Sequence, residues 1–221
     1  MTKRILIAAG GTGGHVFPAS CLAHALKKNE ITFATDQRGI KYINSFNQVI
    51  IQNIKTTPRT MLYASLLINT LKSFIYLIKN RQNIVIGFGG YASIPFLIAA
   101  QSLGIKTVIH EQNAIIGKAN KLLSKFAFKI VTSFENTKGL SPSNKIHHIG
   151  NPTRFEAEYN IKNTKQNDIF TILIFGGSQG ASDFSNDVAD AICKISKEHK
   201  IKVYHQCPAE ELDKTTNKYA A

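Results

Sequence analysis

The sequence predicts an α/β protein with two Rossmann-like, doubly wound domains, the second of them incomplete. Two observations lead to this prediction. Short apolar runs that end in glycine or polar turns alternate with longer helical patterns along most of the chain. The alternation breaks in a polar stretch and then starts again. A repeated β-α rhythm is typical of a parallel sheet that helices cover on both faces.

The front part of the chain contains most of these elements. Ile5–Ala9 is expected to be a buried strand, and the helix that follows it is expected at Pro18–Lys28. Later strands are expected at residues 31–35, 49–52, 84–86, 107–109 and 130–132, and later helices at 59–80, 93–103 and 118–125. These elements would form a first domain over residues 1–150.

Residues 151–168, which are rich in Asn and Lys, are interpreted as a linker between domains. A second domain then occupies residues 169–221, with strands at 169–175 and 201–205 and a helix at 183–197. Residues 206–221 are polar, and no further strand is expected there. A doubly wound domain needs more βα units than this.

The charge is unevenly distributed. The chain carries a net charge of +13, and residues 1–110 hold twelve Lys and Arg against two acidic residues. Such a balance suits an anionic partner, for example a phospholipid surface, a pyrophosphate or a nucleic acid. Because no stacking motif or recognition-helix pattern is found, nucleic acid is not expected as a partner.

Three glycine-rich loops each follow a predicted strand. They comprise Gly10, Gly11, Thr12, Gly13, Gly14 and His15; then Gly87, Phe88, Gly89, Gly90 and Tyr91; and finally Gly176, Gly177, Ser178, Gln179 and Gly180. Ligands bind at the carboxyl edge of open α/β sheets, and glycine allows the backbone to approach a phosphate. Three such loops together predict a nucleotide or phosphate ligand.

The loops alone do not identify that ligand. In the first loop, Val16 stands where a dinucleotide fingerprint requires its third glycine. Asp36 nevertheless resembles a ribose-binding acid, so an NAD-type oxidoreductase remains an alternative. No Gly-Lys-Ser/Thr sequence follows any loop, which disfavours a P-loop phosphotransferase.

Five motifs point to one family. Besides the three glycine loops and their flanking residues, they are His110-Glu111-Gln112-Asn113 and Gly150-Asn151-Pro152-Thr153-Arg154. Together the motifs span nearly the whole chain. Their order and spacing resemble those of MurG-type lipid-linked N-acetylglucosaminyltransferases.

The resemblance implies a GT-B architecture and a role in peptidoglycan synthesis. Such enzymes transfer N-acetylglucosamine from UDP-GlcNAc to lipid I, the undecaprenyl-pyrophosphoryl-MurNAc-pentapeptide, with inversion, and form lipid II. It also implies peripheral attachment to the cytoplasmic face of the inner membrane, with other cell-wall synthesis proteins as further partners. Neither a cofactor nor a metal is expected.

The resemblance also assigns roles to residues. Thr12, Gly13, Gly14, Asn113 and Arg154 would contact the donor, and Ser178 would bind its pyrophosphate.

His15 is the candidate general base, since an unperturbed imidazole titrates near neutrality. Alternatively, His15 only hydrogen-bonds the loop or a lipid phosphate. Glu111 is an alternative base or an acceptor ligand, unless it is a buried structural acid.

The stretch Met61–Lys79 is very apolar. A transmembrane interpretation is disfavoured by Asn69 and Lys72 in its middle and by the βα pattern on both sides. Most of the stretch is expected to be a core helix. One face is expected to form a membrane-binding patch of Tyr63, Leu67, Phe74 and Ile78 with a basic rim of Arg59, Lys72, Lys79 and Arg81.

Members of the family continue beyond the position equivalent to Ala221. The additional part contains the main uracil and ribose pocket. Three alternatives therefore stay open: a truncated product with little activity, a fragment complemented by a separate chain, or an inactive remnant that binds the lipid pyrophosphate.

Overall fold

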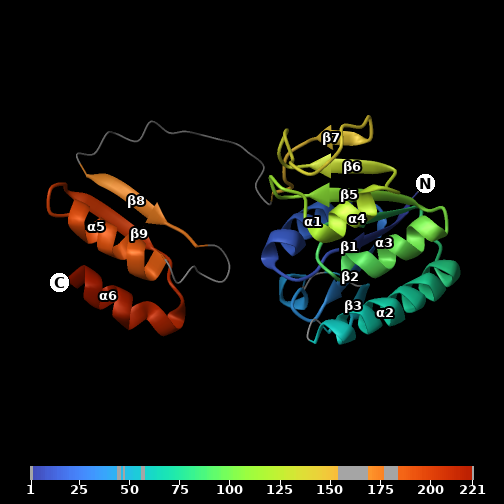
Figure 1. Cartoon of the computed structure of the whole chain (residues 1–221), viewed down its shortest axis with the longest axis horizontal. Helices are drawn as coiled ribbons and strands as arrows, with labels where there is room; N and C mark the ends of the chain where they lie inside the picture. The colour runs from blue at the N-terminus through green and yellow to red at the C-terminus, as the bar shows by residue number, and fades with distance from the viewer. Residues whose placement is uncertain are drawn as a thin grey trace. The chain divides into compact units, whose positions relative to one another are not determined.

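The computed structural model describes residues 2–43, 46, 48–55, 58–153, 169–176 and 184–220 (Figure 1). The chain divides into two compact units, Met1–Glu156 and Ala157–Ala221, here called unit 1 and unit 2. Each unit is an α/β structure with a parallel sheet.

Unit 1 contains a seven-stranded sheet in the order β3-β2-β1-β4-β5-β6-β7, and all neighbouring strands are parallel. The strands are β1 Arg4–Ala8, β2 Glu30–Asp36, β3 Val49–Gln52, β4 Ile84–Gly87, β5 Lys106–Glu111, β6 Lys129–Thr132 and β7 Ile146–His148. The helices are α1 Gly13–Ala25, α2 Arg59–Lys79, α3 Ser93–Ser102 and α4 Lys118–Ser124, with a 3-10 turn at Ile40–Tyr42. The six strands expected here are present, and the three-residue strand β7 is an addition.

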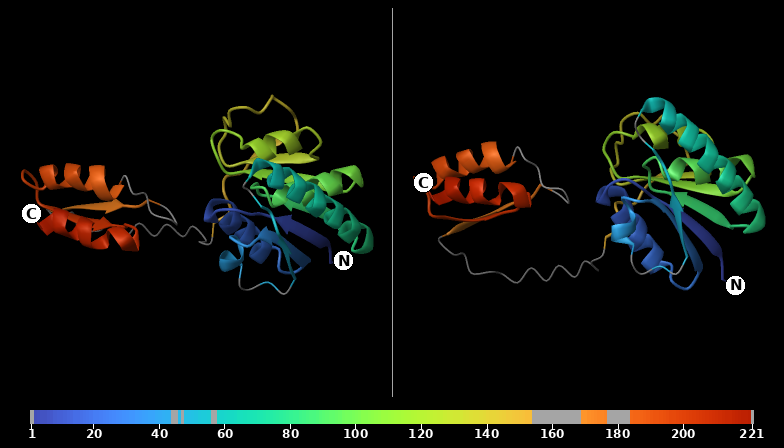
Figure 2. Two further views of the ribbon diagram at one scale, coloured as in Figure 1. Left: turned by 60° about the horizontal axis from the view of Figure 1, so that its bottom comes forward. Right: turned by 90° about the horizontal axis from the view of Figure 1, so that it is seen from below.

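Helices cover both faces of this sheet (Figure 2). Successive residues of a strand point to opposite faces, so β1 contributes to two cores. Leu6 and Ala8 belong to a cluster with side chains of α2, α3 and α4. Ile5 and Ile7 belong to a second cluster with side chains of α1. Burial on both faces explains why the strands are continuous apolar runs rather than alternating ones.

The strand order reverses beside β1. The chain builds β1, β2 and β3 outward, and α2 then carries it back to β4 on the other side of β1. At the carboxyl edge of the sheet, the chain therefore leaves β1 toward β2 and leaves β4 toward β5, in opposite directions. In open α/β sheets, this is the position at which ligands bind.

In unit 2 the described residues contain two parallel strands, β8 Phe170–Ile174 and β9 Ile201–His205. A π-helical turn at Phe184–Val188 leads into α5 Ala189–Ile195, and a 3-10 turn at Ala209–Glu211 precedes α6 Leu212–Ala220. The sequence pattern did not predict α6. Its residues are mostly polar, so no apolar periodicity marks the helix. Among its described side chains, Thr215 alone is buried.

Candidate functional site

The first two glycine loops are in contact through their backbones. The Phe88 N–H donates to the Ala8 carbonyl at 2.9 Å. Gly90 has a φ of +74°, and a Cβ at this position would overlap the Gly10 carbonyl. Likewise, a Cβ on Gly10 would overlap the Cβ of Ala92. The glycines thus bring two loops closer together than side chains would allow.

Helix α1 begins at Gly13, five residues before the expected start at Pro18. Thr12 is the extended N-cap residue, and its carbonyl accepts the N–H groups of His15 and Val16 at 3.2 and 3.3 Å. Glycine and an internal proline both disfavour helix by local rules. Here the burial of Val16 and Ala19 against the sheet overrides these preferences.

This earlier start places Gly13 and Gly14 in the first helical turn. Their N–H groups have no acceptor one turn earlier within the helix, so they remain available to a ligand. The positive end of the helix dipole lies at the same place. Both features favour an anion here, as expected for a phosphate-binding loop.

His15 is part of a hydrogen-bonded chain of side chains. Its Nδ1 lies 2.9 Å from Oε1 of Gln112. Nε2 of Gln112 lies 2.9 Å from Nδ1 of His110 and 3.1 Å from the His110 carbonyl oxygen. Nε2 of His110 in turn lies 3.1 Å from the Gly150 carbonyl oxygen. The network joins three of the sequence motifs.

The ends of this network are held by packing. The rings of Phe88 and His110 stack with centroids 4.9 Å apart. A Cβ on Gly89 would lie 3.3 Å from Cε1 of His15, so the imidazole rests against that glycine. Burial lowers the pKa of His110, although its bond to Gly150 and the charge of Glu111 act in the opposite direction. Burial thus favours the neutral form of His110.

Glu111 is only 1% exposed, and four hydrogen bonds saturate its carboxylate. Oε1 accepts the backbone N–H and the side-chain amide of Asn113, at 3.0 and 2.9 Å. Oε2 accepts the Gly117 N–H at 3.0 Å and the Asn120 amide at 2.9 Å. A carboxylate with this many donors stabilises its loop, and the geometry favours the structural interpretation over the role of base.

Two predicted donor-contacting side chains are solvent-exposed. The amide nitrogen of Asn113 faces Glu111, so its Oδ1 is left as an outward acceptor. Thr12 makes no side-chain cap bond to α1. Tyr91, which ends the second glycine loop two residues before α3, is also exposed. These exposed groups are accessible to a ligand.

Asp36 stabilises the first glycine loop through a hydrogen bond to its backbone. Its Oδ1 accepts the N–H groups of Gly11 and Gly39, both at 3.1 Å, and its Oδ2 pairs with Arg38 at 2.8 Å. Asp36 as a whole residue is 5% exposed. Since both oxygens are occupied within the protein, Asp36 is not available to bind a ribose. The oxidoreductase alternative loses the residue on which it rested.

Several predicted site residues cannot be placed. Arg154, Gly177, Ser178, Gln179 and Gly180 lie outside the described residues. Gly176 is described and half-buried, and Phe175 separates it from the end of β8. The third glycine loop therefore stays a prediction. No local sequence signal identifies Gln112, Asn120 or Arg38 as functional, because their contacts join residues distant in the chain or hold other side chains in place.

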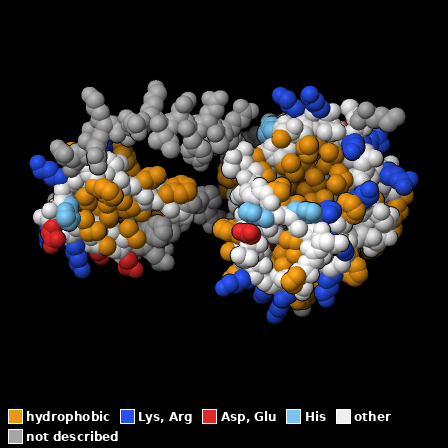
Figure 3. All heavy atoms as spheres, turned by 90° about the horizontal axis from the view of Figure 1, so that it is seen from above, with side chains coloured by type: hydrophobic (Ala, Val, Ile, Leu, Met, Phe, Trp, Pro, Cys, Tyr) orange, Lys and Arg blue, Asp and Glu red, His pale blue; other side chains and the backbone are white. Residues whose placement is uncertain are grey.

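The surface carries the basic excess expected from the sequence. Figure 3 shows one face, on which Lys and Arg side chains surround unit 1 and acidic side chains are sparse. Such a potential attracts anionic ligands and surfaces.

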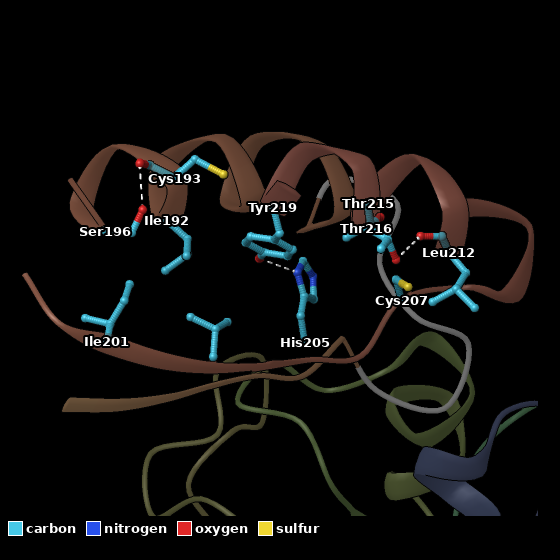
Figure 4. A pocket seen from close by; sticks show the side chains of 11 residues that line it. Ile192, Cys193, Ser196, Ile201, His205, Cys207, Leu212, Thr215, Thr216 and Tyr219 are labelled. Carbon is cyan, nitrogen blue, oxygen red and sulfur yellow. Dashed lines mark hydrogen bonds between the residues drawn. The ribbon is translucent and has the colours of Figure 1, made fainter. Parts of the chain in front are cut away.

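Unit 2 has a cavity of about 410 Å³ between β9, α5 and α6 (Figure 4). His205 and Tyr219 meet in it, with Nδ1 and the hydroxyl 2.8 Å apart. Burial lowers the pKa of His205 and raises that of Tyr219. None of the predicted site residues lines this cavity.

Comparisons with known proteins agree with this site. Residues 5–132 match the glycosyltransferase family 28 N-terminal domain, and residues 171–221 match the corresponding C-terminal domain. The chain belongs to glycosyltransferase family 28. The family resemblance expected from the five motifs is thereby confirmed, and so is the fold class: an α/β protein of GT-B type with Rossmann-like domains.

Relatives within the family have a consistent name. The chain is 37% identical to the UDP-N-acetylglucosamine–N-acetylmuramyl-(pentapeptide) pyrophosphoryl-undecaprenol N-acetylglucosamine transferase of Wolbachia sp. subsp. Brugia malayi, over 97% of this chain and 63% of that protein. It is also 37% identical to the equally named protein of Allorhizobium ampelinum, over 99% of this chain and 63% of that protein. The chain thus spans about 63% of the length of these relatives.

Solved structures show the same fold. The crystal structure of Acinetobacter baumannii MurG has a TM-score of 0.79 and 26% identity, and the match covers 100% of this chain and 65% of that one. A UDP-N-acetylglucosamine 2-epimerase has a TM-score of 0.64 at 13% identity, over 100% of this chain and 67% of that one. The second likeness concerns the fold alone.

Proposed function

We propose that this chain is an inverting glycosyltransferase that moves N-acetylglucosamine from UDP-GlcNAc to lipid I and forms lipid II in peptidoglycan synthesis. One observation carries the proposal: His15 ends the first glycine loop in the first turn of α1, and its imidazole rests against Gly89 of the second loop. The family membership and the names of the relatives support the same reaction.

The proposed chemistry needs a proton acceptor and a site for developing negative charge. His15 accepts the proton from the 4-hydroxyl of the acceptor's muramic acid as that oxygen attacks C1 of the donor sugar. The N–H groups of Gly13 and Gly14 and the dipole of α1 stabilise negative charge beside it. Thr12 and Asn113 contact the sugar, and Arg154 and Ser178 contact the donor.

A transfer assay tests the proposal. Labelled UDP-GlcNAc and lipid I are incubated with this chain as the sole enzyme, and labelled lipid II is measured. We expect turnover in the wild type and a loss of about 10²-fold or more in His15→Ala, since general bases contribute about this much. His24→Ala, which changes another histidine of the same helix, serves as the control.

The assay also separates the alternatives. Normal turnover of His15→Ala with saturating lipid I contradicts the role of His15 as base. Binding of lipid I without any turnover contradicts the transferase activity of this chain and identifies it as a lipid-pyrophosphate-binding remnant.

We further propose that α2 holds the protein peripherally on the cytoplasmic face of the inner membrane, where the lipid acceptor lies. The buried face of α2 is unusually polar. Ser65, Asn69 and Ser73 point inward at four-residue spacing, and the Asn69 amide donates to the carbonyls of Ser65 and Asn53, at 2.7 and 3.1 Å.

The outer face of α2 is apolar. Its exposed large side chains are Met61, Tyr63, Leu67, Ile68, Leu71, Ile75 and Ile78, here called the α2 patch. Phe74, which the sequence analysis included in this patch, instead packs partly buried against the core. By length and composition α2 could cross a membrane, but it connects β3 to β4 and packs against α3. The patch and its basic neighbours fit interfacial binding.

Flotation with vesicles tests the membrane proposal. We expect binding to phosphatidylglycerol vesicles at low salt, little binding to phosphatidylcholine vesicles, and weakening at high salt. The double substitution Leu71→Glu, Ile75→Glu should lower binding by about tenfold or more. Leu173→Glu places the same charge on an exposed leucine of unit 2 and should have no such effect. Equal binding of all three proteins would contradict the proposal.

A further inference from the structure

The hydrogen-bonded chain from the Gly150 carbonyl through His110 and Gln112 to His15 determines which ring nitrogens carry hydrogens. The Gly150 oxygen can only accept, so Nε2 of His110, 3.1 Å away, carries a hydrogen. His110 is only 3% exposed, and this burial favours its neutral form. A neutral imidazole has one N–H, and therefore Nδ1 of His110 holds a lone pair.

The orientation of the Gln112 amide follows from this result. One end of the amide faces two acceptors, Nδ1 of His110 at 2.9 Å and the His110 carbonyl oxygen at 3.1 Å. Only the NH₂ group satisfies both, so the amide oxygen lies at the other end. That oxygen lies 2.9 Å from Nδ1 of His15.

Because an amide oxygen only accepts, Nδ1 of His15 must donate. We propose that Gln112 and His110 are positioning residues that hold His15 in the Nδ1–H tautomer and leave the lone pair on Nε2. This inference rests on the proposed transferase function. In the part of the chain that the structure describes, Nε2 of His15 has no hydrogen-bond partner.

This tautomer gives the base the correct nitrogen. The acceptor hydroxyl transfers its proton to Nε2 while its oxygen forms the new bond to C1 of the donor sugar. The bond from C1 to the UDP oxygen breaks, and its electron pair leaves with the pyrophosphate. His15 is left as an imidazolium. Its Nδ1–H still donates to the amide oxygen of Gln112, and its Nε2 proton is later lost to solvent. The opposite tautomer would present an N–H to the hydroxyl and could not take the proton.

Isolated neutral imidazoles favour the Nε2–H tautomer, so the network makes a prediction that differs from the default. Nuclear magnetic resonance of histidine-labelled protein distinguishes the two forms by the ring-nitrogen and Cδ2 shifts. The measurement is made well above the ordinary histidine pKa, and the resonances of His15 are identified by their absence in His15→Gln. We expect the Nδ1–H form for His15 and the Nε2–H form for His110. The Nε2–H form at His15 in the wild type would overturn the inference.

Two substitutions test whether Gln112 is the cause. Gln112→Leu removes the acceptor, and His15 should revert toward the Nε2–H form. Gln101→Leu is the matched control, since this half-buried glutamine of α3 bonds to the Leu123 carbonyl at 3.0 Å and not to His15. A His15 tautomer that is the same in Gln112→Leu and the wild type would overturn the inference.

The transfer assay adds an independent comparison. We expect Gln112→Leu to lower kcat by about 10²-fold with little change in the KM for the donor, because a base in the wrong tautomer is ineffective. Gln101→Leu should retain the wild-type rate. If the wild-type chain transfers no sugar, the proposed function fails, whereas the tautomer assignment is still decided by the spectra. If transfer occurs and His15 is not held by Gln112, only the positioning role fails.

Discussion

Units 1 and 2 use the same βα pattern with different degrees of cover. In unit 1, helices cover both faces of the sheet, and strands such as β1 and β4 are almost completely buried. In unit 2, α5 and α6 pack against one face of the two strands, while Leu173, Phe175 and Tyr204 are exposed on the other. The deeply buried polar side chains His110 and Glu111 belong to the unit whose sheet is covered on both faces, where burial makes each hydrogen bond to them costly to lose.

Disruption of the contact between the first two glycine loops should cause the largest loss of stability. Gly90→Ala adds a Cβ that overlaps the Gly10 carbonyl at a positive φ, so we expect unit 1 to lose about 4 kcal/mol of unfolding free energy. Gly104→Ala has a similar φ of +68° with open space around it and should cost only about 1 kcal/mol. Urea unfolding measures both, and equal losses would show that the loop contact is unimportant.

Because helices cover both faces of the unit 1 sheet, removal of a buried side chain there should cost more stability than removal of an exposed side chain in unit 2. Leu97 of α3 is fully buried, whereas Leu173 of β8 is 72% exposed. We expect Leu97→Ala to destabilise unit 1 by about 3 kcal/mol. Leu173→Ala should change stability by less than about 0.5 kcal/mol. A large loss in Leu173→Ala would mean that this face of unit 2 is covered in solution.

The hydrogen bonds of Glu111 provide a smaller test. Glu111→Gln replaces one acceptor oxygen by an NH₂ group that faces donors, and we expect a loss of about 2 kcal/mol. Glu198→Gln changes an exposed glutamate of unit 2 and should have almost no effect. Unfolding curves of the two variants under identical conditions check this difference. Equal stability of Glu111→Gln and the wild type would contradict the structural role.

The pH dependence of stability should be the smallest effect. Burial lowers the pKa of His110 below its ordinary value of 6.5, so the folded state binds fewer protons than the unfolded chain. The contribution of neutral His110 is complete above pH 6.5 and is lost as the pH falls below it. His205 shifts in the same direction.

We expect His110→Gln to reduce the acid sensitivity of unfolding more than His205→Gln does, because His110 is the more deeply buried histidine. Unfolding free energies measured on both sides of the ordinary histidine pKa give the comparison. The same pH dependence of the unfolding free energy in the wild type and in His110→Gln would contradict a lowered pKa of His110.

Local sequence patterns predicted much of unit 1. Apolar runs such as Ile5–Ala9 identify strands reliably because strands buried on both faces contain few polar residues. The first two glycine loops could also be located, since each follows such a run. The start of α1 at Gly13 was missed because local rules exclude glycine from helices, whereas packing of Val16 decided the outcome. Strand β7 was missed because three residues carry no periodicity.

By itself, the sequence determined the βα order, the edge of the sheet at which the first two glycine loops lie, and the family. Only the tertiary structure decided what the polar residues of that edge do. His15 and Gln112 are 97 positions apart, and His110 and Gly150 are 40 apart. The outward apolar face of α2 also reverses the usual rule for amphipathic helices. Hydrogen bonds and burial depend on which strands become neighbours, and local periodicity contains no record of that pairing.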